Sequence, residues 1–266
     1  MIQTSQFNDL VKNARVLWRE GFNSIPYAAR KMYDVRNVTD KTSEHSIIDG
    51  YGFAERKNEG EKYVYGSIKQ GYTLNLSQQR IGLMDAVTFE MRKYDKYREI
   101  EKKMRKLGET TAKRIELDLT HQFTFGMSAS SYTNRNGETV YTTSADGQNI
   151  FDTDHTATGN STKYSNLITT AFSRAGLEEA ENKFNTFEDN NGNIVDVMPD
   201  TIITGRNVTI QNAVKEFLKS TLIPDEANNA TNVYAGKYKH LVLPYLGTTA
   251  AGRVTTDYDN YWMLAD

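Results

Sequence analysis

The chain has 266 residues, of which 38% are hydrophobic and 25% charged, enough to build one large domain or two smaller ones. Its 32 basic and 34 acidic residues nearly cancel, whereas a free-standing nucleic-acid-binding domain is usually basic overall. The absence of cysteine excludes a disulfide scaffold, a thiol nucleophile and a cysteine-ligated zinc site. The sequence contains no secretion signal and no apolar run of about 20 residues, so we expect a protein that stays inside the cell and enters no membrane.

The N-terminal third predicts a helix, an arm and a hairpin. Residues 5–20 carry apolar side chains at helical spacing, and residues 22–50 lack such a pattern, which indicates an extended arm with little core. Residues 60–82 alternate partly between apolar and polar side chains, so they are predicted to form a long hairpin with turns or bulges at Gly66 and Gly71. A two-stranded ribbon is marginally stable alone, so we expect it to lie against something else.

Residues 84–126 have the spacing of a long helix, with a break predicted near Tyr94–Tyr97. The part over 97–126 would be about 45 Å long. Residues 92–114 include ten basic and four acidic side chains, a net charge of +6. Taken alone, this pattern favours a solvated helix face with ion pairs, and the alternative is a surface that faces nucleic-acid phosphates.

The remainder predicts a mixture of helices and strands. Residues 128–163 form a polar loop rich in turn signals, which is either functional or holds short strands. A helix is predicted over 164–187, a strand over 194–204 and an amphipathic helix over 206–220, with Ile210, Val214, Phe217 and Leu218 facing inward. Two strands, at 238–243 and 258–264, finish the chain. This order indicates an α+β fold.

The polar loop carries the residues that most resemble a catalytic site, namely Asp146, Asp152, Asp154 and His155. Carboxylate and imidazole groups suit a divalent metal, but short Asp side chains also form turns, and the turn interpretation is favoured. Residues 189–193 do not fit the spacing of a calcium loop, and we predict a type I′ turn at Asn191-Gly192. No HExxH motif, nucleophile elbow or phosphate-binding loop is present, so we expect no enzyme, cofactor or metal.

The stretch over 146–155 resembles the "DGQ…F-(S/D)-T-D-H" motif of major capsid proteins of tailed phages, especially the Mu-type major head subunit group. The order of later segments agrees with the "P-D-x-(L/I)-(L/V)-x", "V-x-P-Y-L" and "W-x-L-A-D" strands of that family. The matching segments are Met198 to Gly205, Val242 to Leu246 and Tyr261 to Asp266. The resemblance covers residues 84–266 well and the N-terminal third only in layout.

This resemblance implies the Hong Kong 97-type capsid fold, which encapsulins share. It implies an N-terminal arm (1–44), an extended hairpin loop (45–82), a peripheral domain with a long spine helix (83–164) and an axial domain (165–266). Family members usually continue past "W-x-L-A-D" with further strands, whereas this sequence stops at Asp266, and both a truncated chain and a shortened family member stay open as interpretations. The implied function is a shell of hexamers and pentamers around double-stranded phage DNA, made in the bacterial host cytoplasm.

The expected partners are other copies of the chain, packaged DNA bound without sequence preference, portal proteins, and scaffold or decoration proteins. Because the arm and hairpin have too little local core, we expect shell contacts to bury some of their apolar residues. These are Phe7, Leu10, Leu17, Trp18, Tyr72 and Leu74. We expect Lys102, Lys103, Arg105 and Lys106 to face the DNA. The alternatives are an encapsulin-like compartment shell, a metal-dependent hydrolase that uses Asp152, Asp154 and His155, and a phage tail or connector protein.

Overall fold

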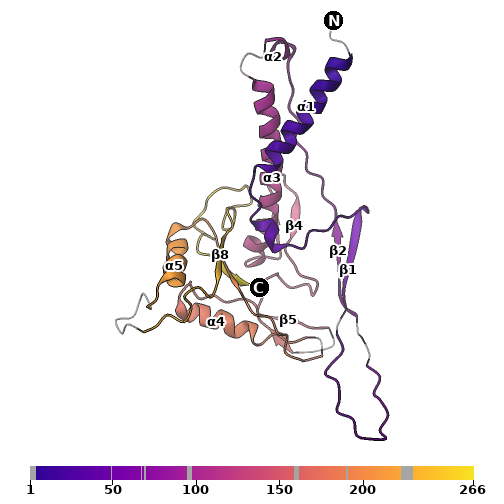
Figure 1. Ribbon diagram of the computed structural model, residues 1–266, viewed down its shortest axis with the longest axis vertical. Helices are drawn as coiled ribbons and strands as arrows, with labels where there is room; N and C mark the ends of the chain where they lie inside the picture. The colour runs from indigo at the N-terminus through magenta and orange to yellow at the C-terminus, as the bar shows by residue number, and fades with distance from the viewer. Residues whose placement is uncertain are drawn as a thin grey trace. The chain divides into compact units, whose positions relative to one another are not determined.

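The computed structural model describes residues 4–48, 50–66, 68, 70–94, 98–158, 162–189, 191–222 and 230–266. The chain forms two compact units: unit 1 contains Met1–Arg36 and Gln78–Thr120, and unit 2 contains Asn37–Ser77 and His121–Asp266. Both helices and small sheets are present, as the α+β prediction requires (Figure 1). Among the described residues, no helix combines the length and apolarity that crossing a membrane requires.

Unit 1 is helical. It contains α1 (Thr4–Asn23), the short 3-10 helix η1 (Ala29–Met32), α2 (Phe89–Tyr94) and most of α3 (Glu99–Gly126), whose last turns belong to unit 2. The helix predicted over 5–20 is confirmed by α1. The break predicted near Tyr94–Tyr97 lies mostly outside the described residues; α2 ends at Tyr94 and α3 begins at Glu99. Residues 84–88 carry no regular structure, so the prediction that the helix starts at 84 was wrong.

Helices α1 and α3 approach each other closely at two glycines. A Cβ atom on Gly21 would lie 2.1 Å from the carbonyl oxygen of Arg105, and one on Gly108 would lie 2.1 Å from the carbonyl oxygen of Trp18. Only a residue without a side chain fits at either position, because real Cβ atoms do not approach backbone so closely. The close approach therefore depends on glycine in both helices.

The segment after α1 is attached to α3 rather than extended. Ala29 is fully buried, and its backbone N–H donates to Oε1 of Glu116 at 2.6 Å. The hydroxyl of Tyr33 donates to the carbonyl of Leu119 at 2.8 Å. The prediction that residues 22–50 have little core was therefore wrong for this part, since a buried carboxylate on α3 satisfies its backbone.

Unit 2 begins with an antiparallel hairpin of β1 (Thr42–Ile48) and β2 (Gln70–Ser77), in which Thr42 lies opposite Ser77. The hairpin predicted over 60–82 was therefore placed wrongly, because its first strand lies some twenty residues earlier. The strands are joined by a long connection, and residues 50–66 within it have no regular secondary structure. The register shifts between Ser46 and Ile48.

The polar loop over 128–163 holds two short antiparallel ribbons. One pairs β3 (Ser131–Thr133) with β4 (Thr139–Tyr141), and the other pairs β5 (His155–Thr156) with β6 (Lys163–Tyr164). The alternative that this loop contains short strands is confirmed. Gly137 and Gly147 take positive φ angles of 83° at its turns, as the Asn-Gly and Asp-Gly signals indicate.

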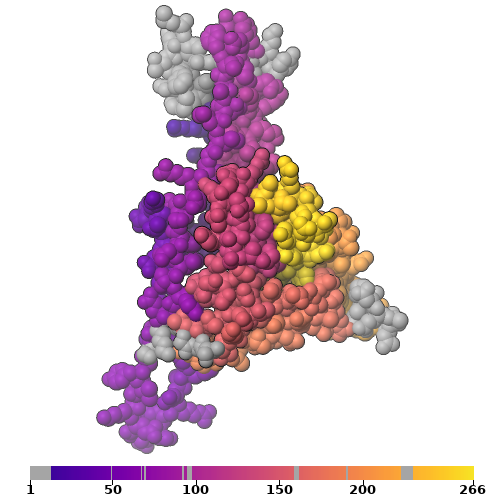
Figure 2. All heavy atoms as spheres, turned by 180° about the vertical axis from the view of Figure 1, so that it is seen from behind, coloured from indigo at the N-terminus to yellow at the C-terminus, as the bar shows by residue number. Residues whose placement is uncertain are grey.

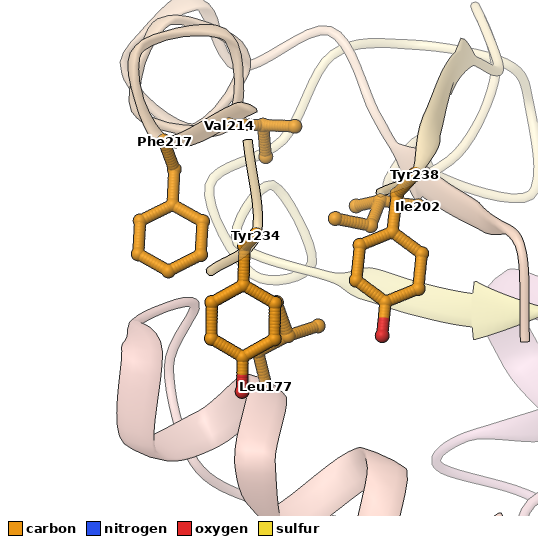
Figure 3. Close-up of a cluster of buried hydrophobic side chains, with 6 residues drawn as sticks. All are labelled: Leu177, Ile202, Val214, Phe217, Tyr234 and Tyr238. Atoms are coloured by element: carbon orange, nitrogen blue, oxygen red, sulfur yellow. The ribbon is translucent and has the colours of Figure 1, made fainter. Parts of the chain in front are cut away.

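The rest of unit 2 packs two helices against a three-stranded sheet. Strand β7 (Thr201–Thr204) pairs in parallel with β8 (Lys239–Val242) and antiparallel with β9 (Trp262–Ala265). The helices are α4 (Arg174–Phe184) and α5 (Val208–Lys219), capped by the side chains of Ser173 and Asn207. Figure 3 shows the buried cluster between them, formed by Leu177, Ile202, Val214, Phe217, Tyr234 and Tyr238.

Several predicted elements in this region were too long. The helix over 164–187 is limited to α4, because the residues before Ser173 contribute to β6 and to loop hydrogen bonds. The strand over 194–204 is limited to β7. Asn191 does not have the positive φ that a type I′ turn needs, and only Gly192 does, with φ 79°. The inward face of α5 is confirmed: Val214 and Phe217 are buried, with Ile210 and Leu218 packed beside them.

Candidate functional site

The connection between β1 and β2 exposes apolar side chains. Phe53, Tyr63 and Tyr65 are 85%, 83% and 98% exposed, and the neighbouring Tyr51 and Val64 are also exposed. In Figure 2 this loop, in purple, protrudes at the lower end of the view. Single exposed apolar residues are common on protein surfaces, but a run of them in one segment indicates an interaction site. We call residues 50–66 the aromatic loop.

Unit 1 has a second exposed apolar segment, just before α2 and within it. The exposed side chains are Ile81, Leu83, Met84, Val87, Phe89 and Tyr94, and Met84 is 93% exposed. Sequence reasoning missed this surface, because it placed residues from 84 onward on the long helix. One feature of the sequence could have indicated this exposed segment. Gly82 and Asp85 interrupt its apolar residues, so the run fits neither helical nor strand periodicity.

The predicted assembly residues have different environments. Trp18 is half-buried and stacks on Phe22 with ring centroids 5.1 Å apart, and Leu17 is also half-buried. The hydroxyl of Tyr72 lies 3.1 Å from Oγ1 of Thr156, and Leu74 is 37% exposed. Phe7 and Leu10 lie on the part of α1 whose side chains are outside the described structure. Of the six predicted assembly residues, Leu74 alone is an exposed apolar residue among those whose side chains are described.

The four basic residues expected to face DNA all pair with carboxylates in unit 1. Lys102 pairs with Glu99, Lys103 with Asp85, Arg105 with Glu20 and Lys106 with Glu109, over 2.8–3.2 Å. Their side chains remain 35–75% exposed, so water screens these pairs and each contributes little stability. The Lys106 hydrogen bond lowers the pKa of Glu109.

The two units carry opposite net charges. Unit 1 has 17 basic and 11 acidic residues, a net charge of +6, and unit 2 has 15 basic and 23 acidic residues, a net charge of −8. The net charge of −2 for the whole chain hides this separation. The basic charge is concentrated in the unit that contains most of α3.

The motif residues of the polar loop form a buried hydrogen-bonded pair. Nδ1 of His155 lies 2.7 Å from Oδ2 of Asp146, and both side chains are 5% exposed. The hydroxyl of Ser144 and the N–H of Gln148 donate to the other oxygen of Asp146. Burial raises the pKa of Asp146, but the hydrogen bonds from Ser144, His155 and Gln148 lower it by more, so it lies below its usual value. The ring of His155 stacks on Tyr164.

The remaining acids of the loop have separate partners. Oδ1 of Asp152 accepts hydrogen bonds from the N–H groups of Thr153 and Asp154, as expected for a turn-forming Asp. Asp154 pairs with Lys163 at 3.2 Å. Within the described ranges, no three His, Asp or Glu side chains gather as a metal ion would require. The loop geometry thus fits turn formation better than the hydrolase alternative.

Comparisons with known proteins agree with this structural reading. A family model described as phage capsid protein matches residues 71–266. Among solved structures, a chain of the procapsid of bacteriophage JBD30 matches with a TM-score of 0.57 and 14% sequence identity, over 91% of this chain and 99% of that chain. A search of curated proteins gives no match. The structural match confirms the α+β, Hong Kong 97-type capsid fold.

Proposed function

The chain belongs to the phage capsid protein family and is a structural protein of a phage shell, and from this premise we propose that its copies assemble as hexamers and pentamers into an icosahedral shell around double-stranded DNA. The observation that carries the proposal is the aromatic loop, whose apolar side chains are exposed in the isolated chain. Full burial of one such side chain stabilises an interface by about 1.5–3 kcal/mol. Several of them in each copy supply a substantial driving force for association.

We further propose that the chain has four parts with separate places in the shell. These are the arm (1–44), the hairpin loop (45–82), the peripheral domain (83–164) and the axial domain (165–266). The hairpin loop contacts neighbouring copies. Closure of a shell requires each copy to offer one patch to a different patch of its neighbour, and a protruding loop with a separate receptor surface provides such a pair. Portal and scaffold or decoration proteins are the further partners, and synthesis takes place in the host cytoplasm.

The basic residues of α3 are proposed to face the packaged DNA. The net charge of +6 on unit 1 supports this placement, because clustered like charge is offset by phosphate. The carboxylate partners of Lys102 and Lys106 lie one helical turn away, and both lysines are exposed, so phosphate competes with weak, screened ion pairs. Contacts of this kind do not read base sequence.

An encapsulin-like compartment shell is the second candidate, since it shares the fold. The basic character of unit 1 favours a nucleic-acid content over an enclosed enzyme. A catalytic role is not proposed, because each candidate side chain of the polar loop has a structural partner.

The proposal is tested by replacing Tyr63 and Tyr65 of the aromatic loop with Ser and following assembly by sedimentation velocity. Both side chains are exposed in the isolated chain, so the fold should survive while large assemblies become rarer. A matched control is Tyr141→Ser, which removes a 71% exposed tyrosine from β4 of the same unit. Equal assembly of the loop variant and the wild-type chain would contradict a role for the loop.

A further inference from the structure

Unit 2 contains an apolar pocket of about 220 Å³. Its walls come from the turn after α3, the polar loop, the segment 166–168, α4 with the turn that follows it, and β9. The aromatic lining residues are Phe151, Phe184, Phe187 and Trp262. Small-molecule sites usually occupy roughly 300–1,000 Å³. The pocket is below that range, which points to a single side chain as its occupant.

The chemistry of the lining narrows that occupant further. Aromatic rings pack well against other aromatic rings in edge-to-face or offset contacts, so four aromatic walls favour an aromatic side chain. Lys183 of α4 is the charged residue of the lining. Within the described part of the chain, no carboxylate pairs with its Nζ atom. A carboxylate close to the aromatic ring would complete the site.

The aromatic loop contains a segment with this pattern. Phe53 is 85% exposed, Glu55 is also exposed, and neither side chain contacts a described residue through a hydrogen bond, ion pair or ring interaction. In an extended backbone, residues two apart point to the same side, so the ring of Phe53 and the carboxylate of Glu55 would face one surface together.

Two other side chains of the loop, one aromatic and one acidic, are engaged within the loop itself. The Nζ atom of Lys57 lies 3.6 Å from the ring centroid of Tyr63. The carboxylate of Glu61 accepts hydrogen bonds from the backbone and side chain of Asn58 at 3.0 and 3.1 Å. Tyr65 is exposed, but no acid stands two residues from it, so Phe53 with Glu55 is the pair that matches the pocket.

We propose that Phe53 of one copy inserts into this pocket of a second copy, with Glu55 pairing with Lys183. The inference rests on the proposed function, since it names the receptor for the loop. The amide of Asn191 donates to the carbonyl of Gly50 at 3.1 Å, so the start of the loop is held to its own unit 2. Phe53 remains exposed in that arrangement, which favours insertion into a neighbour.

Because the chain has no cysteine, engineered cysteines give a clean test. Chains with Glu55→Cys alone are mixed with chains carrying Lys183→Cys alone, assembled, treated with a short bismaleimide crosslinker and separated on a denaturing gel. An ion pair between two long side chains holds its Cα atoms further apart than the roughly 7 Å that a direct disulfide allows, so a short crosslinker is used in place of oxidation. We expect a crosslinked dimer in the mixture at least several-fold more abundant than in either variant by itself.

The matched control replaces Glu59, an exposed acid four residues further along the same loop, with Cys. This variant should give little dimer with Lys183→Cys. In a second measurement, Glu55→Lys and Lys183→Glu should each reduce assembly, and the double exchange should restore it.

Three results would overturn the proposal. Shells that form without the mixed dimer would reject this contact while leaving the capsid function intact. In a chain that carries both cysteines, a crosslink confined to single chains would show that Phe53 enters its own pocket. A wild-type chain that forms no assemblies would reject both the contact and the proposed function.

Discussion

Gly21 of α1 and Gly108 of α3 form a reciprocal contact, in which each glycine faces a backbone carbonyl of the other helix. The missing side chain at Gly108 leaves room for the carbonyl of Trp18, and the missing side chain at Gly21 leaves room for that of Arg105. The ion pair between Glu20 and Arg105, at 3.1 Å, lies beside this crossing. Unit 1 is therefore held together by close backbone packing as well as by side chains.

Gly108→Ala should destabilise unit 1 by about 2–3 kcal/mol, because overpacking against backbone cannot be relieved by a rotamer change. Urea denaturation followed by circular dichroism measures the difference. Gly82→Ala in the same unit is the control, since a Cβ there meets nothing within 4 Å. If the two variants are equally stable, the helices are not as close as described.

Glu116→Ala should cost about 1–3 kcal/mol, since it leaves the buried N–H of Ala29 without its acceptor. The control is Glu101→Ala, which removes an exposed acid from the same helix. Protection of the Ala29 amide from hydrogen exchange should fall in the Glu116 variant and stay unchanged in the control. Unchanged protection in both variants would show that Glu116 does not hold this segment.

Asp146→Asn should destabilise the polar loop by about 1.5–3 kcal/mol at neutral pH, because it weakens charged hydrogen bonds in a buried site. The pKa of Asp146 is lowered from the ordinary 3.8, so its carboxylate stabilises the folded chain above that pH. This contribution is lost as the pH falls through the folded-state pKa. Stability measured between pH 7 and pH 2 should therefore show the variant and the wild-type chain converging in acid.

Asp154→Asn provides the matched control for this loop. Its ion pair with Lys163 is more than half exposed, so its loss should cost less than about 1 kcal/mol. A larger effect at Asp154 than at Asp146 would contradict the assignment of the buried pair as the structural centre of the loop.

Local patterns predicted the helices better than the strands. The apolar spacing of Val214 and Phe217 was sufficient to predict α5, because a helix depends on neighbours three and four residues away. Strand β1 contains Thr42, Ser43, Glu44, His45 and Ser46 before its first apolar residue, so alternation gave no signal. Strand β1 pairs with β2 across a long connection. A pattern over a few neighbouring residues carries no information about such a pairing.

The burial of polar residues was also not predictable from the sequence. An acid within a charged helix, such as Glu116, is indistinguishable in sequence from a solvated one. His121 of α3 is likewise buried, with Nε2 lying 3.0 Å from Oγ1 of Thr248. The pocket around Lys183 joins five separate segments, so no single motif could indicate it.

Replacing Lys102, Lys103, Arg105 and Lys106 together with Gln should leave the helix intact, because Gln is a comparable helix former. Empty shells should still assemble, while packaged DNA is lost at lower salt than from wild-type shells, since fewer counterions are released on binding. The comparison uses DNA release from purified particles across a salt series. A shell structure that places these side chains on the outer surface would contradict the proposal.

The central claim is that this chain builds a closed shell. Negative-stain electron microscopy of the purified chain, over a range of concentrations and salt, tests it most directly. We expect closed particles together with free hexamers and pentamers, and these should disappear when the aromatic loop is altered. Sedimentation as a compact, stable monomer under every condition, with no particles on the grid, would contradict it.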